Sequence, residues 1–381
     1  MKKIKIFAMQ KDEDDILSEW ILYHSYLVGI DNIYIIDNNS GENSKKILSH
    51  YEKQGLHVYT RNDYSKKGTY LYELIKGVEN DCDLAIPIDL DEFISVLDIQ
   101  NVSNEILIKF ARQCMMFDNT YYCNQYADVR KLLKKDEAFH HFVKYGYTSQ
   151  RQPCSNINIR IIEDNECLSY IKKNSHLILK YHPEWVISCN KEQILKQFNE
   201  LPLFGRYAFS YYLTSRNMEM DYQNPIEDVL YFDTVDMTDH HDPGGNCNKK
   251  FFVPKTLQGV DHGNHYGRVS ELTKFQCKPT NLVLFHFHHR GVRKLIQKCK
   301  NDILGLGQVK NINDQRELKE KIKQCVPGAH NIETYLNYLI KGPYSLCMTE
   351  DSGLYINVLS DKIKTIKKNT NLIIFNDVPV I

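Results

Sequence analysis

The stretch Leu84-Ala85-Ile86-Pro87-Ile88-Asp89-Leu90-Asp91-Glu92-Phe93 changes character half-way along. It begins as an apolar run typical of a buried strand and continues into closely spaced carboxylates. In an extended strand the side chains of residues i and i+2 share one face, so Asp89 and Asp91 are predicted to reach one divalent cation, Mg²⁺ or Mn²⁺, where the strand ends. The alternative is that the two aspartates only cap a turn.

The residues before this stretch alternate between strand and helix patterns. Strands are expected at residues 4–9, 32–36, 56–60 and 84–88, and helices at residues 13–28, 44–54 and 68–80. This alternation predicts an α/β fold with a mainly parallel sheet flanked by helices. Ligands of such sheets bind at the carboxyl ends of the strands, where Asp89 and Asp91 are expected.

The remainder of the chain is divided by composition. Residues 1–100 form the first half of the α/β domain, and residues 101–200 are expected to form a mainly helical insertion. Strand patterns return at residues 207–213 and 281–288 within a second half, 201–300, and a helical extension with a strand-like end at residues 372–375 is expected over 301–381.

Composition limits the classes of protein. The chain has 48 basic and 48 acidic residues, which gives no support to nucleic-acid or membrane-surface binding. Its 11 cysteines form an odd set without a C-x-x-C pair, as expected of free thiols in a reducing compartment. No signal peptide and no transmembrane segment is evident, so a cytoplasmic location is expected.

Three segments carry a resemblance to a known family. Glu19-Trp20-Ile21-Leu22-Tyr23-His24, Ile33-Tyr34-Ile35-Ile36-Asp37-Asn38-Asn39-Ser40 and Ile86 to Phe93 stand in the order typical of family-2-like glycosyltransferases. His286-Phe287-His288-His289-Arg290-Gly291, followed by Lys298, is similar to a late segment of that family. The chain departs from the pattern at Glu42, where the family has Asp, and at Gly291, where it has Ser.

The resemblance implies a Rossmann-like GT-A fold and an inverting, metal-dependent transfer from a nucleotide-sugar, a UDP-sugar, to a saccharide or glycoconjugate. His286 would be a third metal ligand. His288 is added because residues i and i+2 of a strand share a face. The resemblance further implies contacts to the nucleotide or its phosphates from Gln10, Lys11, Asp14, Asp37, Asp89, Lys249, Lys250 and His262.

An inverting transfer also needs a carboxylate that deprotonates the acceptor hydroxyl. Asp261 and Asp242 are the leading candidates, with Asp239 and the pair Glu227-Asp228 as further ones. The spacing of these residues does not single out one of them.

Within residues 101–200, two segments resemble a small helical module found attached to bacterial glycosyltransferases. They are Tyr121-Tyr122-Cys123-Asn124-Gln125-Tyr126-Ala127-Asp128-Val129 and His141-Phe142-Val143-Lys144-Tyr145-Gly146, the latter followed by Arg151-Gln152-Pro153. Their aromatic spacing predicts a small packed core without catalytic residues.

Two other functions remain open. Histidines and a carboxylate could activate water in a metallohydrolase. These residues are His240, His241, Asp242, His262, His265, His286 and His288. The other alternative is a carbohydrate-binding scaffold without turnover, although such a protein needs neither the paired aspartates nor the late histidine.

Overall fold

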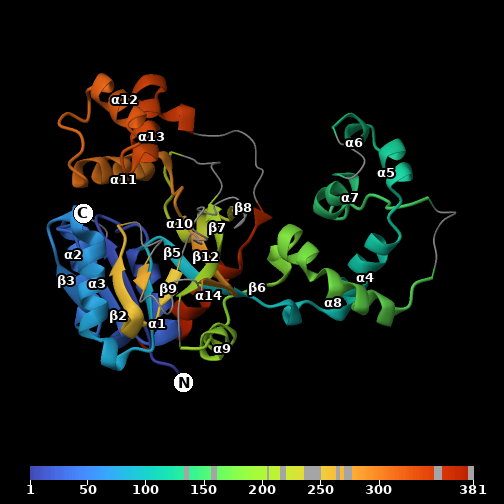
Figure 1. The fold of residues 1–381 in the computed structure, drawn as a ribbon, viewed down its shortest axis with the longest axis horizontal. Coiled ribbons are helices and arrows are strands. Elements are labelled where there is room, and N and C mark those ends of the chain that lie inside the picture. Colours follow the sequence, from blue (N-terminus) through green and yellow to red (C-terminus); the bar gives the residue numbers. More distant parts are fainter. Residues whose placement is uncertain are drawn as a thin grey trace. The chain divides into compact units, whose positions relative to one another are not determined.

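The computed structural model describes residues 1–132, 137–155, 161–203, 206–214, 220–235, 250–262, 267–269, 277–346 and 354–375. The chain forms two compact units, shown in Figure 1. The first comprises Met1–Val96 and Cys189–Ile381, and the second comprises Leu97–Ser188.

The first half of the sheet is parallel. Strands β1 (Ile4–Gln10), β2 (Ile33–Asp37), β3 (His57–Thr60) and β4 (Leu84–Pro87) lie in the order β3-β2-β1-β4. The connecting helices are α1 (Leu17–Val28), α2 (Glu42–Glu52) and α3 (Lys67–Gly77). These elements confirm the expected alternation and give an α/β fold compatible with a Rossmann-like architecture.

The second half of the sheet is mixed. Strand β9 (Lys250–Phe252) pairs antiparallel with both β4 and β7 (Arg206–Thr214), and β12 (Cys277–His286) pairs parallel with β7. Strand β12 therefore runs in the same direction as β4. Strand β5 (Glu92–Leu97) pairs antiparallel with β12, and His286 stands opposite Glu92. The carboxyl ends of β1, β2, β4 and β12 consequently lie at one edge of the sheet.

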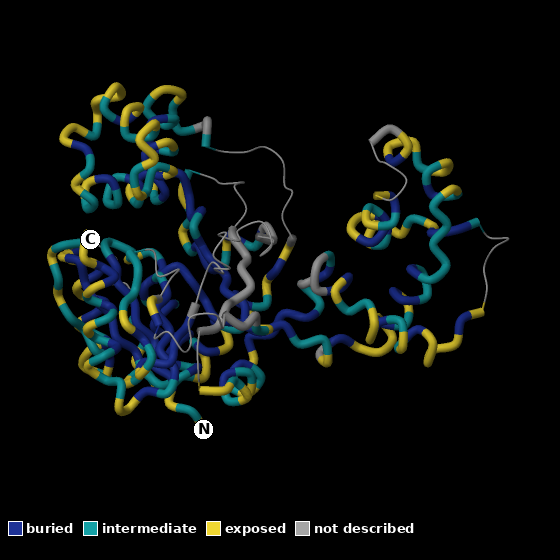
Figure 2. The backbone as a smooth tube through the Cα atoms, viewed as in Figure 1, coloured by how far each residue is buried: buried dark blue, intermediate teal, exposed yellow. Residues whose placement is uncertain are grey.

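The core lies between the sheet and its helices, where Figure 2 shows buried strands beneath helices with exposed outer faces. On one face, Phe7 and Met9 of β1 pack with Leu71 and Ile75 of α3. Glycine permits the close approach of α3 to β10 (Leu257–Val260), because a Cβ at Gly68 would lie 2.3 Å from the Val260 carbonyl oxygen.

Three helices follow β12 and pack on one another. They are α11 (Val292–Gly305), α12 (Gln315–Lys323) and α13 (Ala329–Lys341). Gly291 precedes α11 with φ of 95°, and a Cβ there would lie 3.2 Å from the Met220 carbonyl oxygen. This conformation strains L side chains and accounts for glycine at the position where the resembled family has serine.

The other regular elements of the first unit are shorter, except for the last helix. They are α9 (Lys191–Glu200), α10 (Pro225–Asp228), β8 (Tyr231–Val235), β11 (Gly267–Val269), β13 (Leu354–Tyr355) and α14 (Val358–Asn369). Helix α14 packs against α1, where Lys367 pairs with Glu19 at 2.7 Å.

The second unit is mainly helical. Its elements are α4 (Asn104–Met115), α5 (Asn119–Gln125), α6 (Ala127–Leu132), α7 (Glu137–His141), α8 (Asp164–Tyr181) and the short strand β6 (Ile187–Ser188). Tyr122, Phe110 and Phe142 are fully buried within it. The unit overlaps the helical insertion expected over residues 101–200, but it begins at Leu97 and ends at Ser188, and α9 belongs to the first unit.

Three expectations about local structure are wrong, and one of them is the strand expected to continue to residue 288, because β12 ends at His286. Strand β4 ends at Pro87, two residues before Asp89, and residues 372–375 form no regular element. None of the described helices combines the length and the apolar character that a membrane span requires.

Candidate functional site

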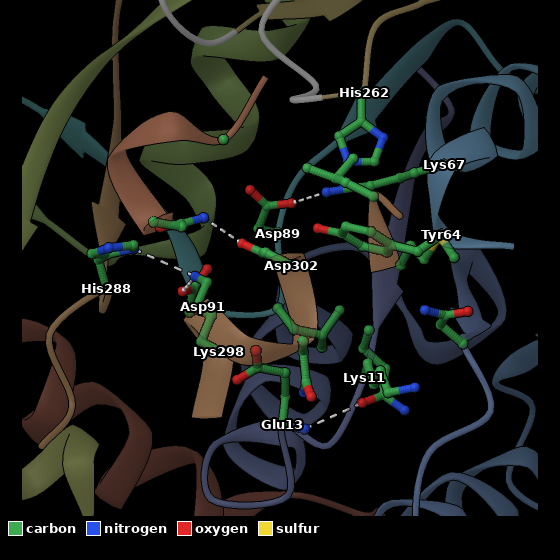
Figure 3. A pocket seen from close by; sticks show the side chains of 18 of the residues that line it. Lys11, Glu13, Tyr64, Lys67, Asp89, Asp91, His262, His288, Lys298 and Asp302 are labelled. Carbon is green, nitrogen blue, oxygen red and sulfur yellow. Dashed lines mark hydrogen bonds and ion pairs between the residues drawn. The ribbon is translucent and has the colours of Figure 1, made fainter. Parts of the chain in front are cut away.

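The site lies where the carboxyl ends of β1, β2, β4 and β12 meet, as expected for an open α/β sheet. The loops after these strands line a pocket of about 420 Å³, together with the loop after β10 and residues of α11 and α13. All lining residues belong to the first unit. Figure 3 shows the side chains that converge in this pocket.

A tight turn carries the two aspartates. The Glu92 amide donates to the Asp89 carbonyl oxygen at 3.1 Å, and the Asp89 amide donates to the Glu92 carboxylate at 2.9 Å. The Trp20 indole donates to the Asp89 and Glu92 carbonyl oxygens at 3.1 and 2.8 Å. The Tyr23 hydroxyl donates to the Ile94 carbonyl oxygen at 2.5 Å. Within the Glu19–His24 motif, Trp20 therefore stabilises the turn and Tyr23 stabilises the strand that follows it.

Asp91 meets the late histidines because of sheet register. The Phe287 amide donates to the Asp91 carbonyl oxygen at 2.7 Å, next to the pairing of His286 with Glu92. One potential ligand atom from each of Asp91, His286 and His288 lies within 4.8 Å of the others. Asp91 is 2% exposed, and no described group hydrogen-bonds its Oδ1 atom. A carboxylate oxygen and two imidazole nitrogens form a donor set that fits a divalent metal ion.

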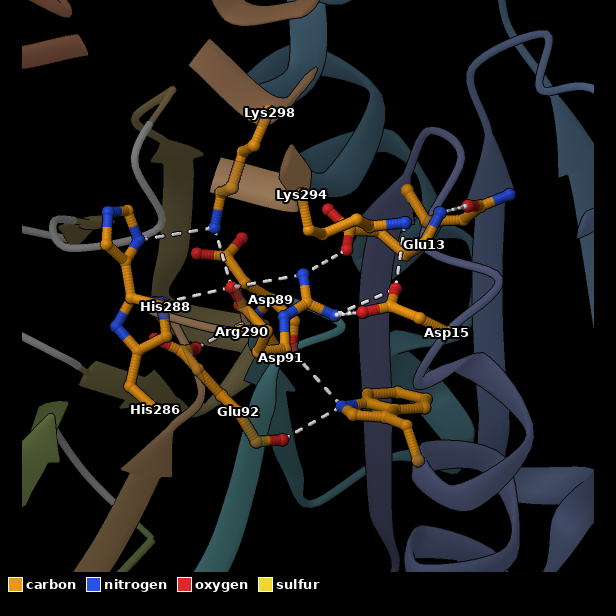
Figure 4. A network of polar contacts seen from close by, with 12 residues as sticks. Glu13, Asp15, Asp89, Asp91, Glu92, His286, His288, Arg290, Lys294 and Lys298 are labelled. Atoms are coloured by element: carbon orange, nitrogen blue, oxygen red, sulfur yellow. Dashed lines mark hydrogen bonds and ion pairs between the residues drawn. The ribbon is translucent and has the colours of Figure 1, made fainter. Parts of the chain in front are cut away.

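Lys298 of α11 joins this cluster, as Figure 4 shows. Its ammonium lies 2.6 Å from Asp91 Oδ2 and 3.5 Å from His288 Nδ1. Burial opposes ionisation of Asp91, but Lys298 and His286 outweigh it and hold the pKa of the carboxyl well below its ordinary value. Burial, and next Lys298, hold the pKa of His288 well below 6.5. The carboxylate is thus charged and the imidazole neutral, as metal ligation requires.

Asp89 lies outside the group of ligand atoms that Asp91 forms with the histidines. Its carboxylate accepts from the Lys67 ammonium at 2.6 Å. Because β4 has already ended, Asp89 and Asp91 stand in a turn, and the alternation of a strand does not apply to them. The turn directs one carboxylate to Lys67 and the other to the histidines.

The loops after β1 and β2 line another side of the pocket. Gln10, Lys11 and Asn38 line the pocket, and no described group hydrogen-bonds the buried Oδ1 atom of Asn38. Asp37 is not a lining residue, because its carboxylate accepts from the Gln10 amide at 2.6 Å and from the Ser40 backbone amide at 3.3 Å. Asp37 holds the two loops together, and its neighbour Asn38 faces the pocket.

A network of ion pairs around Arg290 and Lys294 lies next to the cluster formed by Asp91, His286 and His288. Arg290 is 2% exposed, pairs with Glu13 and with Asp15 at 3.2 Å, and lies 4.0 Å from Asp91. Lys294 pairs with Asp15 at 2.8 Å and with Asp14 at 3.3 Å. Asp14 is therefore engaged in this network and is not a lining residue of the pocket.

The loop after β10 lines the side of the pocket near α3. Asp261 and His262 line the pocket, and the His262 ring meets the Tyr64 ring edge-on at 4.8 Å between centroids. Burial, and next Lys67, lower the pKa of His262. His262 is therefore a neutral polar group at the pocket wall.

Some candidates fall on parts of the chain that the structure does not describe. Asp239, His240, His241, Asp242, Lys249 and His265 lie outside the described residues, and for Lys250 only the backbone in β9 is described. Glu227 and Asp228 lie in α10 and do not line the pocket.

No family model matches the chain, and no curated protein matches it.

Several lining residues escaped the sequence analysis. Tyr64 and Lys67 come from the segment before and at the start of α3, and Asp302 and Asn331 come from α11 and α13. Asp302 stands four residues after Lys298, so helical spacing predicts that both share one face. No comparable local signal marks Tyr64, Lys67 or Asn331.

Proposed function

We propose that this protein is a metal-dependent glycosyltransferase with a GT-A fold. In this proposal it moves a sugar from a nucleotide-sugar, a UDP-sugar, to a saccharide or glycoconjugate acceptor, with inversion. The observation that carries the proposal is the group formed by Asp91, His286 and His288 beside the ammonium groups of Lys67 and Lys298, at the carboxyl edge of the sheet. The volume of the pocket, about 420 Å³, lies in the range of small-ligand sites.

Each group has a chemical task in this proposal. Asp91, His286 and His288 would hold Mn²⁺ or Mg²⁺, which supplies a Lewis acid that neutralises charge on a diphosphate leaving group. Lys67 and Lys298 place fixed positive charge on either side of Asp89 and Asp91, where phosphate oxygens of a donor would be attracted. Asn38, Gln10 and Lys11 offer hydrogen bonds to the nucleoside.

A thermal-shift panel tests this function. UDP-, GDP-, dTDP- and CMP-sugars are added with and without Mn²⁺, since a ligand that binds only the folded state raises its apparent stability. We expect stabilisation by one nucleotide class that requires Mn²⁺. Asp91→Asn should abolish this shift, and Glu320→Gln, a charge-neutralising change at an exposed position of α12, should retain it. Equal shifts with and without Mn²⁺ would contradict the proposal.

The ligand set itself favours a second candidate, a metallohydrolase. Two imidazoles and one carboxylate are also a common zinc set, in which the metal activates water. Stoichiometric zinc in the purified protein, hydrolysis of bis(p-nitrophenyl) phosphate and no response to nucleotide-sugars would favour this alternative. Donor binding without any release of nucleotide would instead favour the scaffold.

A further inference from the structure

Helix α11 directs two charged side chains into the pocket, one helical turn apart. Lys298 bonds to Asp91, and Asp302 lies on the same face, farther along the helix. The Asn331 side chain, from α13, donates to Asp302 Oδ2 at 2.6 Å. Figure 3 shows this carboxylate in the pocket, with Asp89 and Tyr64 around it.

The carboxylates that line the pocket differ in their partners. Asp91 and Asp89 bond to ammonium groups at 2.6 Å, and Glu13 pairs with Arg290. Asp302 takes part in no ion pair formed by the described residues, and its hydrogen-bond partners, the Asn331 amide and the Tyr64 hydroxyl, are neutral. A carboxylate without a bound cation keeps more of its basicity than one in a salt bridge.

The surroundings of Asp302 act in the same direction. Burial raises the pKa of Asp302, against the opposing effects of Lys298, the Tyr64 hydroxyl and Lys67, while Glu13 adds to the increase. Burial, and next the charges of Asp302 and Asp89, raise the pKa of Tyr64 well above 10, so its hydroxyl stays protonated as a donor. A carboxyl group with a raised pKa is a more effective proton acceptor near neutral pH.

Further polar or ionisable groups come from α11, from α13 and from the loop after β10. Cys299, on the same helix, is buried, and burial raises the pKa of its thiol to about 12, which leaves it uncharged. Asn331 is the amide partner from α13, and His330 next to it is exposed at the pocket rim. Asp261, on the loop after β10, is a further carboxylate that lines the pocket.

We propose that Asp302 is the general base that deprotonates the acceptor hydroxyl, an inference that rests on the proposed glycosyl transfer. Asp302 takes the proton of the hydroxyl while the hydroxyl oxygen forms a bond to the anomeric carbon of the donor sugar. The bond from this carbon to the phosphate oxygen breaks, and its electron pair leaves with the nucleoside diphosphate. Asn331 and Tyr64 hold the carboxylate, and the proton later passes to solvent.

The test measures nucleotide release from the donor that stabilises the wild-type protein, in the presence of Mn²⁺ and with water as the acceptor. Asp302→Asn preserves an oxygen for the Asn331 hydrogen bond, so the fold and the donor-induced thermal shift should be retained. The kcat for release should fall at least about 100-fold, the usual contribution of a general base. Glu333→Gln, at an exposed position of α13, is the matched control and should release nucleotide at the wild-type rate.

A pH profile separates a base from a structural residue. The hydrogen bond from Asn331 stabilises the ionised form of Asp302, so Asn331→Ala should raise the pKa of the base. The acidic limb of the kcat profile should therefore move to higher pH, which a merely structural role would not cause.

The possible results distinguish this inference from the proposed function. Wild-type release by Asp302→Asn, or a loss that appears in Asp261→Asn instead, would overturn the role of Asp302 and leave the glycosyltransferase intact. The absence of donor binding in the wild-type protein would instead refute the proposed function itself.

Discussion

At the scale of single residues, the site depends on the ion pairs that its buried and partly buried charged side chains form. Lys298 compensates Asp91, Lys67 compensates Asp89, and Arg290 compensates Glu13 and Asp15. Each of these ammonium or guanidinium groups is largely removed from water, where an unpaired charge would be costly. The network therefore fixes its members in place before any ligand arrives.

His24 predicts a pH dependence of folding. It is fully buried, its Nδ1 atom lies 2.9 Å from the Trp20 carbonyl oxygen, and burial lowers its pKa from 6.5 to about 3. Between these values the unfolded chain binds the proton and the folded chain does not, so stability falls as the pH falls. Between pH 7 and pH 5 this should cost about 2 kcal/mol in the free energy of unfolding.

Urea unfolding of the wild-type protein and of His24→Leu at several pH values checks this effect. The variant should lose less stability on acidification than the wild-type protein, whatever its stability at pH 7. Parallel pH dependences of the two proteins would show that His24 is not the responsible group.

At the scale of elements, helix α1 supports the turn that follows β4. Trp20 bonds to both ends of the turn, His24 stacks near Phe93, and Tyr23 bonds to β5. The Glu19–His24 motif, read from sequence through its resemblance, is thus explained by its contacts to the aspartate turn. None of Trp20, Tyr23 and His24 lines the pocket.

Trp20→Phe tests this support. The change removes the indole N–H and leaves the Asp89 and Glu92 carbonyl oxygens without this donor, which should cost about 1–3 kcal/mol of stability. Because the turn positions Asp91, the concentration of Mn²⁺ needed for the donor-dependent thermal shift should also rise. Unfolding by urea measures the first effect, and a Mn²⁺ titration measures the second. An unchanged Mn²⁺ requirement would mean that the turn keeps its geometry without the indole.

At the scale of the whole molecule, the pocket belongs to the first unit. The pocket takes its lining from Met1–Val96 and Cys189–Ile381 alone, whereas Leu97–Ser188 has its own aromatic core around Phe142, Tyr122 and Phe117. Donor binding should therefore tolerate damage to the core of the second unit.

Phe142→Ala tests this independence. Phe142 is fully buried, and truncation of such a ring typically costs about 3–5 kcal/mol. Calorimetry should show a transition of the second unit at lower temperature, while the Mn²⁺-dependent shift produced by the donor remains as in the wild-type protein. Loss of that shift in a variant whose first unit is still folded would show that the second unit contributes to the site.

Local patterns predicted the parallel half of the sheet, its helices and the position of Asp89 and Asp91 directly after β4. These features follow from periodicity and from short motifs, which depend on neighbouring residues. Tertiary structure alone decided that Asp91 joins the histidines while Asp89 pairs with Lys67, because the register of β5 against β12 sets His286 opposite Glu92. It also brought Asp302, Tyr64 and Asn331 together, since packing between distant elements leaves no periodic trace in sequence.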